Sequence, residues 1–364
     1  MNNKLKIVFF GSGDFPVLSL NSILSDTSLF EVVGVVSSKD KQYIFKEGIS
    51  NIAKQNNIPL IIPEDVNSSE TIKFLKDLRP DIFCVISYKK LSHEILSIPT
   101  IASFNVHASL LPLLRGAAPI QWALRFGLKK TGLTSFLLTD KIDAGPIICN
   151  KVIDIKEEEN YGSLLKKMCV ESVSVVRRTL TKLSKNDYLL NVIDQPYFES
   201  NFELFKAPKI NANNNIIEWG EFVSEKIINY LKSVYPYNGI TAKLYVTKQI
   251  DEANADIIDK IDLKIYKGHI TDNIPPHMIN YFDKINQLSD LNFFKGDRHT
   301  LYSSCNIVTD FKKHMYFKTV DGKIIEIDEL QISGKKVMKT PDFLHGFKYC
   351  RDNENVFILN EMDV

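Results

Sequence analysis

The amino-terminal half of this 364-residue chain alternates between short apolar runs and helical segments, and this alternation is the strongest constraint on its fold. The apolar runs predict strands over residues 5–10, 31–36, 59–62, 81–87, 101–106, 134–138 and 147–155. Strands that are joined through helices pair in parallel, because a parallel pair needs a long crossover connection. The pattern therefore predicts an α/β fold with a doubly wound, mainly parallel, Rossmann-like sheet covered by helices on both faces.

The second half of the chain has a different pattern. A long amphipathic helix is predicted over residues 161–183, and the polar segment that follows has little periodicity and is interpreted as a linker. Farther on, short strand-like runs recur, and Asp321-Gly322 between two of them is a strong hairpin signal. We expect a catalytic α/β domain at 1–185, a linker at 186–208, and a small OB-like β-barrel domain at 209–364 with a possible insertion at about 252–301.

Composition narrows the classes of function. Hydrophobic residues make up 44% of the chain and charged residues 24%, which is typical of a globular protein. The net charge of +1 gives no general attraction to nucleic acid or membrane, so a polyanionic partner needs a local basic patch. The five cysteines lack CxxC spacing, which favours a reducing compartment and argues against a zinc site or a disulfide framework. Neither a membrane-spanning run nor a signal-peptide pattern is visible.

Polar residues follow several of the predicted strands. The carboxyl ends of parallel strands meet at one edge of a sheet, where ligands bind, so we expect these residues to gather there. They are Gly11-Ser12, Ser87-Tyr88, Asn105 with His107, and the loop 140–146. The glycine turn lacks the third glycine of G-x-G-x-x-G, because Pro16 holds that position. A tight strand-to-helix turn is therefore favoured over a nicotinamide site.

Asn105, His107 and Asp143 together suggest carbonyl chemistry. Asn105 and His107 are two positions apart at the end of a strand, so their side chains point to the same side. Each residue alone fits a structural role, and an aspartate before Ala-Gly-Pro is most often a turn former. A carboxylate beside the ring would orient it and favour its charged form. The trio then fits acyl-type transfer, in which an amine attacks a carbonyl carbon and the amide and imidazolium stabilise the oxyanion.

Several motifs of this chain resemble those of a known family. The motifs are Asn105-Val-His107, Ser109-Leu-Leu-Pro112, Arg115-Gly-Ala-Ala-Pro119, Asp143-Ala-Gly145, the opening turn 10–15 and the carboxyl-terminal signature 330–338. Together they resemble the methionyl-tRNA formyltransferases, within the wider class of formyltetrahydrofolate-dependent transferases. The resemblance runs over nearly the whole chain and is strongest at residues 101–146.

The resemblance implies a reaction and a set of site residues. The donor would be 10-formyltetrahydrofolate, the acceptor the methionine amino group of initiator Met-tRNA, and no metal would take part. Asn105, His107 and Asp143 would be catalytic. The folate site would be lined by Ser87, Tyr88, Ser109, Leu110, Leu111 and Pro112. The acceptor would contact Gly11, Ser12, Arg115, Lys39, Lys41, Lys335 and Lys336, although a solvated face explains Lys335 and Lys336 equally well.

Two other functions stay open from the sequence. One is a formyltransferase that acts on an amino sugar nucleotide or another small amine, against which the carboxyl-terminal signature argues. The other is a non-catalytic RNA-binding protein of the same fold, which has no need of an intact catalytic trio. We expect a monomer. The extra length at 252–301 favours a mitochondrial or other organellar location, and a bacterial protein of this kind would be cytoplasmic.

Overall fold

The structure, a computed structural model, describes residues 4–26, 28–38, 44–185, 192–196, 206–249, 254–276, 278, 292–294, 305–348 and 355–360. The chain forms two compact units. The first consists of Met1–Ala123, Leu128–Glu159 and Ser163–Lys209, and the second of Leu124–Gly127, Asn160–Gly162 and Ile210–Val364. The segment expected to be a linker, 186–208, thus belongs entirely to the first unit.

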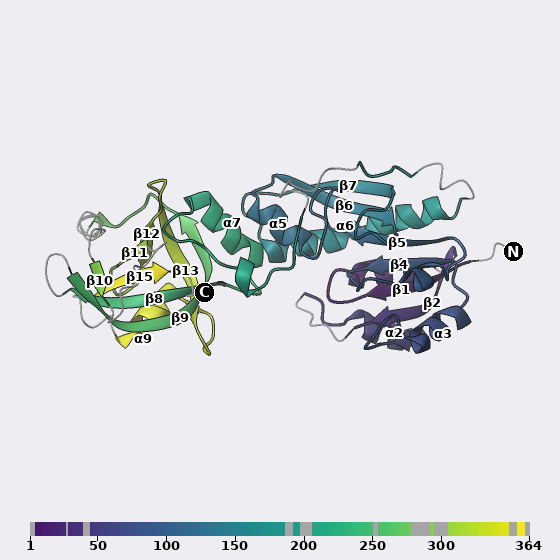
Figure 1. Ribbon diagram of the computed structural model, residues 1–364, viewed down its shortest axis with the longest axis horizontal. Helices are drawn as coiled ribbons and strands as arrows, with labels where there is room; N and C mark the ends of the chain where they lie inside the picture. Colours follow the sequence, from purple (N-terminus) through teal and green to yellow (C-terminus); the bar gives the residue numbers. More distant parts are fainter. Residues whose placement is uncertain are drawn as a thin grey trace. The chain divides into compact units, whose positions relative to one another are not determined.

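The first unit is built on one seven-stranded sheet, seen in Figure 1, with the order β3-β2-β1-β4-β5-β6-β7. The strands are β1 Leu5–Gly11, β2 Phe30–Ser37, β3 Leu60–Ile61, β4 Ile82–Ile86, β5 Ala102–His107, β6 Lys130–Leu137 and β7 Ile147–Asp154. Pairing is parallel from β3 to β5, whereas β6 is antiparallel to both of its neighbours. A short loop joins β6 to β7, and strands joined by a short loop pair antiparallel.

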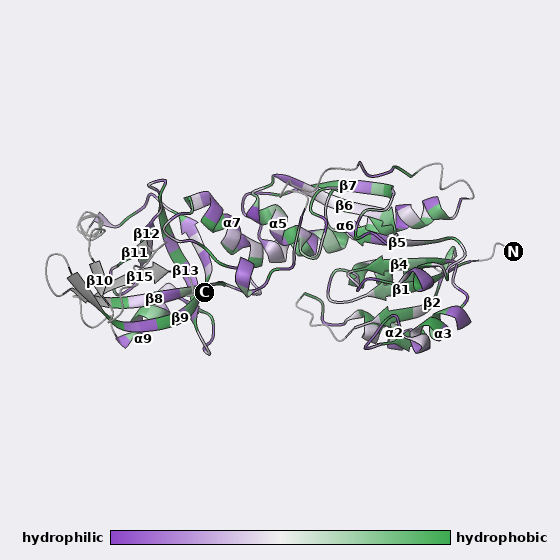
Figure 2. Cartoon of the chain, viewed as in Figure 1, coloured by the Kyte–Doolittle hydropathy of each residue, from purple (hydrophilic) through white to green (hydrophobic). Residues whose placement is uncertain are grey.

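Helices cover both faces of this sheet. They are α1 Val17–Leu24, α2 Ile49–Gln55, α3 Ser69–Asp77, α4 His93–Leu96, α5 Pro119–Arg125 and α6 Tyr161–Leu183. Side chains of β1 and β4 pack against Leu75 of α3 and Ile95 of α4 on one face. The strand order reverses after β3, so right-handed crossovers put α1 and α2 on the opposite face. There α1 bonds to α6 through the hydroxyls of Ser19 and Ser172, 2.8 Å apart. Figure 2 shows the hydrophobic central strands between these layers.

The second unit is a curled, mostly antiparallel sheet with the order β10-β9-β8-β15-β11-β12-β13-β14. Its elements are α7 Ser224–Val234, β8 Ile240–Gln249, β9 Asn254–Ile270, β10 Asn292–Phe294, β11 Cys305–Thr309, β12 Met315–Lys318, β13 Ile324–Ile332, β14 Met338–Lys339, α9 Thr340–Gly346 and β15 Asn355–Asn360. Strand β13 also pairs with β9, so the pairings close into a ring. The predicted fold class, a Rossmann-like sheet followed by a small β-barrel, is confirmed.

Strand β9 changes the interpretation of the expected insertion at 252–301. Its residues, Asn254–Ile270, pair with β8 on one side and with β13 on the other, so this part belongs to the barrel. Sequence analysis missed most of it because charged residues interrupt the apolar run before Leu263. Most of the remaining segment, 279–291 and 295–301, lies outside the described residues.

The hairpin turn at Asp321-Gly322 joins β12 to β13 as predicted, with Gly322 at a φ of 78°. Helix α7 has Val223 as its N-cap, without a side-chain cap of its own. Asp321 caps the helix from the hairpin turn. Its carboxylate accepts hydrogen bonds from the Ser224 backbone N–H at 2.9 Å and from the Ser224 hydroxyl at 2.7 Å. Burial raises the pKa of Asp321, but hydrogen bonds from Thr319 and Ser224 outweigh this and lower the pKa to about 2.

Candidate active site

The carboxyl ends of β1, β2 and β4 are tied together by polar contacts. The Ser12 hydroxyl donates to the Ser87 carbonyl at 2.7 Å, and the Tyr88 hydroxyl donates to the Ser37 carbonyl at 3.1 Å. Gly11 has no room for a side chain, because a Cβ would lie 2.9 Å from the Pro16 ring. The glycine turn is therefore a tight strand-to-helix turn. Gly11, Ser12, Ser87 and Tyr88, all predicted site residues, gather at this edge of the sheet.

Strand β5 brings the next two predicted residues to the same edge. Asn105 lies between Val85 of β4 and Phe136 of β6, in the middle of the sheet. His107 is only 7% exposed, and its Nε2 lies 2.8 Å from the Leu114 carbonyl oxygen. A carbonyl can only accept, so Nε2 carries the hydrogen in this contact. The contact fixes the ring and leaves Nδ1 as the nitrogen that faces Asp143.

Asp143 comes to the ring from the loop between β6 and β7. Its Oδ2 lies 3.7 Å from His107 Nδ1, which is an ion-pair distance and too long for a direct hydrogen bond. The same oxygen accepts the Gly116 backbone N–H at 2.9 Å. The three predicted catalytic residues therefore come from the end of one strand, β5, and from the loop between β6 and β7. The Asp143 side chain is 12% exposed, so its charge lies in a largely dry environment.

The segment after β5 folds back as a compact turn. Thr134 of β6 holds it: its hydroxyl donates to the Ser109 carbonyl at 2.7 Å and accepts the Leu111 N–H at 3.1 Å. The Ser109 hydroxyl donates to the Leu113 carbonyl, and Ser109 is fully buried. Of the four residues of this turn predicted to line the folate site, Ser109 and Leu111 are buried and Leu110 and Pro112 are half-buried.

Two pieces of the expected linker form part of the site, which sequence analysis missed. Gln195 donates through Nε2 to the carbonyls of Asp143 and Gly145, at 3.0 and 2.8 Å, and accepts from Arg115 Nη2 at 2.6 Å. Ala207 donates to the Arg115 carbonyl at 2.7 Å and accepts the Ala118 N–H at 3.0 Å. A glutamine and an alanine in an aperiodic stretch carry no local signal that would have marked them.

Arg115 is a cation that interacts with Asp143 of the trio. Burial lowers the pKa of its guanidinium, and the charge of Asp143 opposes that shift. Its Nε is buried without a hydrogen-bond partner within the described part of the chain. Arg115 is thus held on one side by Gln195 and only partly satisfied.

Four lysines were also predicted to contact the acceptor. Lys39 and Lys41 lie outside the described residues. Lys335 and Lys336 are exposed in the turn between β13 and β14, in the second unit. Over the described ranges, no group of histidine, cysteine, aspartate or glutamate side chains could hold a metal ion. Over the same ranges, no helix is long and apolar enough to cross a membrane.

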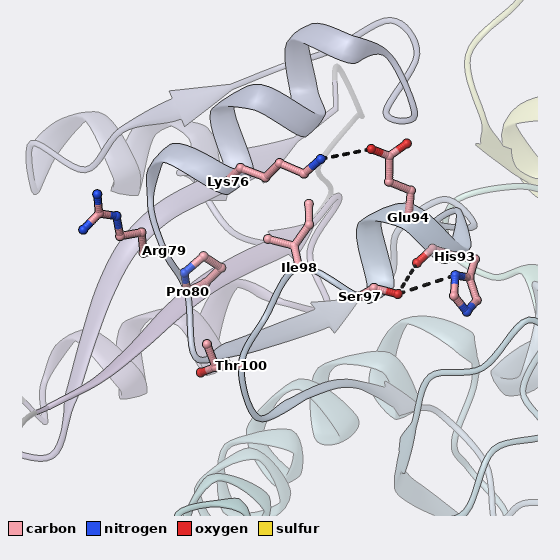
Figure 3. A pocket seen from close by; sticks show the side chains of 8 residues that line it. All are labelled: Lys76, Arg79, Pro80, His93, Glu94, Ser97, Ile98 and Thr100. Carbon is pink, nitrogen blue, oxygen red and sulfur yellow. Dashed lines mark hydrogen bonds and ion pairs between the residues drawn. The ribbon is translucent and has the colours of Figure 1, made fainter.

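A hollow of about 800 Å³ in the first unit is separate from this cluster. It lies at the opposite, amino-terminal edge of the sheet, because its lining includes Pro80 before β4 and Thr100 before β5 (Figure 3). Lys76 and Glu94 form an ion pair of 3.1 Å at its rim. We therefore assign the candidate active site from the polar cluster and not from this hollow.

Comparisons with known proteins match the whole chain. The profile of the formyl transferase family matches residues 5–180, and that of the formyl transferase C-terminal domain matches residues 209–348. The methionyl-tRNA formyltransferase of Flavobacterium johnsoniae is 32% identical over 95% of this chain and 97% of its own. That of Chlorobium limicola is 29% identical over 98% of this chain and 100% of its own.

A solved structure has a similar fold. The N-formyltransferase of Helicobacter canadensis, in complex with folinic acid and dTDP-3-aminofucose, is 17% identical with a TM-score of 0.57. The match covers 89% of this chain and 98% of that one.

Proposed function

This chain belongs to the methionyl-tRNA formyltransferase family, and from that premise we propose that it transfers the formyl group of 10-formyltetrahydrofolate to the amino group of methionine on initiator Met-tRNA. It is a formyltransferase. The observation that supports the proposed chemistry best is the cluster of Asn105, His107 and Asp143, in which the carboxylate lies 3.7 Å from His107 Nδ1.

The proposed reaction forms a bond from the methionine nitrogen to the formyl carbon and breaks the bond from that carbon to the folate nitrogen. Negative charge develops on the formyl oxygen, and preformed donors stabilise it. The Asn105 amide is one such donor. His107 Nδ1 is the other when the ring is doubly protonated, because Nε2 is already bonded to Leu114.

A proton must leave the attacking amine and reach the departing folate nitrogen. Asp143 is the base best placed to take part, because its carboxylate is held between His107 and the Gly116 N–H. Its dry surroundings strengthen its interaction with the ring. Ser87, Tyr88 and the turn Ser109–Pro112 would shape the donor site, and Arg115 the mouth through which the acceptor enters.

The alternatives have less support. A sugar formyltransferase shares the fold at 17% identity, which is a likeness of fold alone, whereas tRNA enzymes match at about twice that identity. A non-catalytic RNA-binding protein does not account for a buried histidine and aspartate held face to face. A contact of tRNA with Lys39, Lys41, Lys335 and Lys336, and the monomeric state, stay predictions.

The expected organellar location has no support. The relatives are bacterial, and the Chlorobium limicola protein matches over its whole length, so the segment 252–301 does not make this chain unusually long. The argument from length to an organelle therefore loses its basis.

The proposal is tested by incubating the protein with 10-formyltetrahydrofolate and charged Met-tRNA and measuring formylmethionine. His107→Ala should lower kcat by about 100-fold or more, because a polarising and proton-transferring group is lost. His93→Ala is the matched control, since His93 is exposed in α4 and outside the candidate active site. Turnover of an amino sugar without turnover of Met-tRNA would overturn the proposed acceptor, and an unchanged kcat for His107→Ala would overturn the assigned role.

A further inference from the structure

We propose that Gln195 is a positioning residue for formyl transfer: its carboxamide holds the Asp143 loop and Arg115 together so that the Asp143 carboxylate faces His107. This inference rests on the proposed function, because it concerns how the carboxylate of that mechanism is held. It extends the active site into a segment that sequence analysis interprets as a linker.

The Gln195 carboxamide uses both of its functional ends. A primary amide has two donor hydrogens and an acceptor oxygen. Nε2 donates to the Asp143 carbonyl at 3.0 Å and to the Gly145 carbonyl at 2.8 Å, and Oε1 accepts from Arg115 at 2.6 Å. The reverse orientation would put oxygen against two carbonyl oxygens and the NH₂ group against a guanidinium. The partners therefore fix a single orientation of the amide.

Asp143 needs such support because its backbone is strained. It has a φ of 49°, in the left-handed region that residues other than glycine adopt at a cost. Such a conformation persists when surrounding contacts impose it. Gln195 bonds the carbonyl of the strained residue itself, and the same residue's carboxylate faces His107.

The contacts of Gln195 also close a ring. Asp143 accepts the Gly116 N–H at 2.9 Å, Gly116 follows Arg115 in the chain, and Arg115 donates to Gln195. The Gln195 carboxamide thus links the backbone of Asp143 to Arg115. The residue after Arg115, Gly116, donates the hydrogen bond that the Asp143 carboxylate accepts. Without the Gln195 carboxamide, the Asp143 loop and the segment around Arg115 are no longer joined through that side chain.

The backbone of the segment has its own anchor. Ile193 exchanges two hydrogen bonds with Ile147, at 2.7 and 2.9 Å, while its side chain is 69% exposed. These bonds do not involve the Gln195 side chain, so they survive its substitution. Changes at Gln195 therefore remove the clamp and leave the path of the chain in place.

Two substitutions separate the ends of the amide. Gln195→Met keeps the length and removes all three bonds. Gln195→Glu keeps an oxygen for Arg115 but sets a carboxylate oxygen against two carbonyls. We expect both variants to lower the single-turnover transfer rate about 10- to 100-fold, with KM for the donor within about twofold, because the carboxylate loses its position and the donor site does not. Asp194→Ala, at the exposed neighbour, is the matched control and should keep the wild-type rate.

A rate for Gln195→Glu or Gln195→Met within twofold of wild type would overturn the proposal. Thermal unfolding gives the fraction of each variant that is unfolded at the assay temperature. A loss of rate that this unfolded fraction fully explains would also overturn the proposal, because a merely structural role of Gln195 predicts that outcome.

Hydrogen exchange on the substrate-free protein gives a readout that is independent of activity. The Gly116 amide and residues 143–145 should exchange faster in Gln195→Met than in wild type or Asp194→Ala, and equal exchange would contradict the clamp. A wild-type protein that does not formylate Met-tRNA would overturn the proposed function instead, and the exchange comparison would still decide on the clamp.

Discussion

At the scale of single residues, the site depends on backbone conformations that few side chains favour. Ser87, Leu114 and Asp143 have φ values of 52°, 57° and 49°. The Ser87 and Leu114 carbonyls accept from Ser12 and His107, and the Asp143 side chain faces the His107 ring. Each of these three residues thus makes a contact in the candidate active site from a strained backbone conformation. Strained conformations tend to occur at active sites.

Gly145 offers a test of how tightly the Asp143 loop is held. A Cβ on Gly145 would lie 1.8 Å from the Leu137 carbonyl oxygen, and backbone cannot move aside as a flexible side chain does. Gly145→Ala should lower the unfolding free energy by about 1–3 kcal/mol. It should also slow formyl transfer about tenfold or more, because the loop must shift.

Denaturant unfolding and single-turnover assays measure both effects. Gly346→Ala is the control, since a Cβ there meets nothing within 4 Å, and it should change the unfolding free energy by less than about 0.5 kcal/mol. An active, fully stable Gly145→Ala protein would show that the loop tolerates displacement.

The sequence was informative at this scale where local spacing decides the outcome. The two-residue interval placed Asn105 and His107 on one strand, and the loop of the following strand pair was where a carboxylate could reach the ring. Gln195 could not be found in this way. It lies 52 residues from Asp143 and 80 from Arg115, and no periodicity connects residues so far apart.

At the scale of elements, strongly periodic segments were the most predictable. The sequence predicts helices over residues 49–55 and 161–183, and α2 Ile49–Gln55 and α6 Tyr161–Leu183 have these bounds. Within strand β9 the sequence predicts a strand only over residues 263–266, because the charged residues Asp259, Lys260 and Asp262 interrupt the apolar pattern before them. Pairing on both sides of the strand overrides that local polarity.

The contact of Asp321 with α7 predicts a dependence of stability on pH. The folded pKa of about 2 lies below the ordinary value of an aspartate, so the folded state prefers the ionised form. The stabilisation is present above the unfolded pKa and is lost as the pH falls through about 2. Asp321→Asn should therefore destabilise the protein near neutral pH and converge with wild type in strong acid.

The expected size is modest, below about 1 kcal/mol at pH 7, because the carboxylate is exposed and solvent screens it. Unfolding free energies measured from pH 2 to pH 7 check the effect, with Asp272→Asn as the control on an exposed aspartate. A pH-independent difference between Asp321→Asn and wild type would refute the cap.

At the scale of the whole molecule, the proposed function requires an almost neutral chain to bind a polyanion. The net charge is +1, so any attraction to tRNA has to come from local groups. Lys335 and Lys336 fit this role: both are exposed, next to Gly334 at a φ of 78°, in a turn of the second unit. The composition of the chain excluded a strong overall positive charge, but it could not show where on the fold a local basic patch lies.

The proposed tRNA contact makes a prediction about salt. The logarithm of the tRNA affinity should fall linearly with the logarithm of salt concentration, because bound cations release counterions. Lys335→Ala and Lys336→Ala should each reduce that slope by about one. Lys76→Ala is the control, because its ammonium group pairs with Glu94 in the first unit. Binding that does not respond to salt would rule out phosphate contacts.

Gln195 and Ala207, which bond to loops of the candidate active site, have a consequence for the order of events during synthesis. Asn105 and His107 leave the ribosome first, followed by Asp143, but Gln195 and Ala207 bond to the loops that hold them. A nascent chain that stops before residue 195 has the three proposed catalytic residues and lacks the Gln195 and Ala207 contacts that support their loops. Ala207, the last of these residues to be made, lies three positions before Ile210, where the main part of the second unit begins, so the candidate active site is completed late in translation.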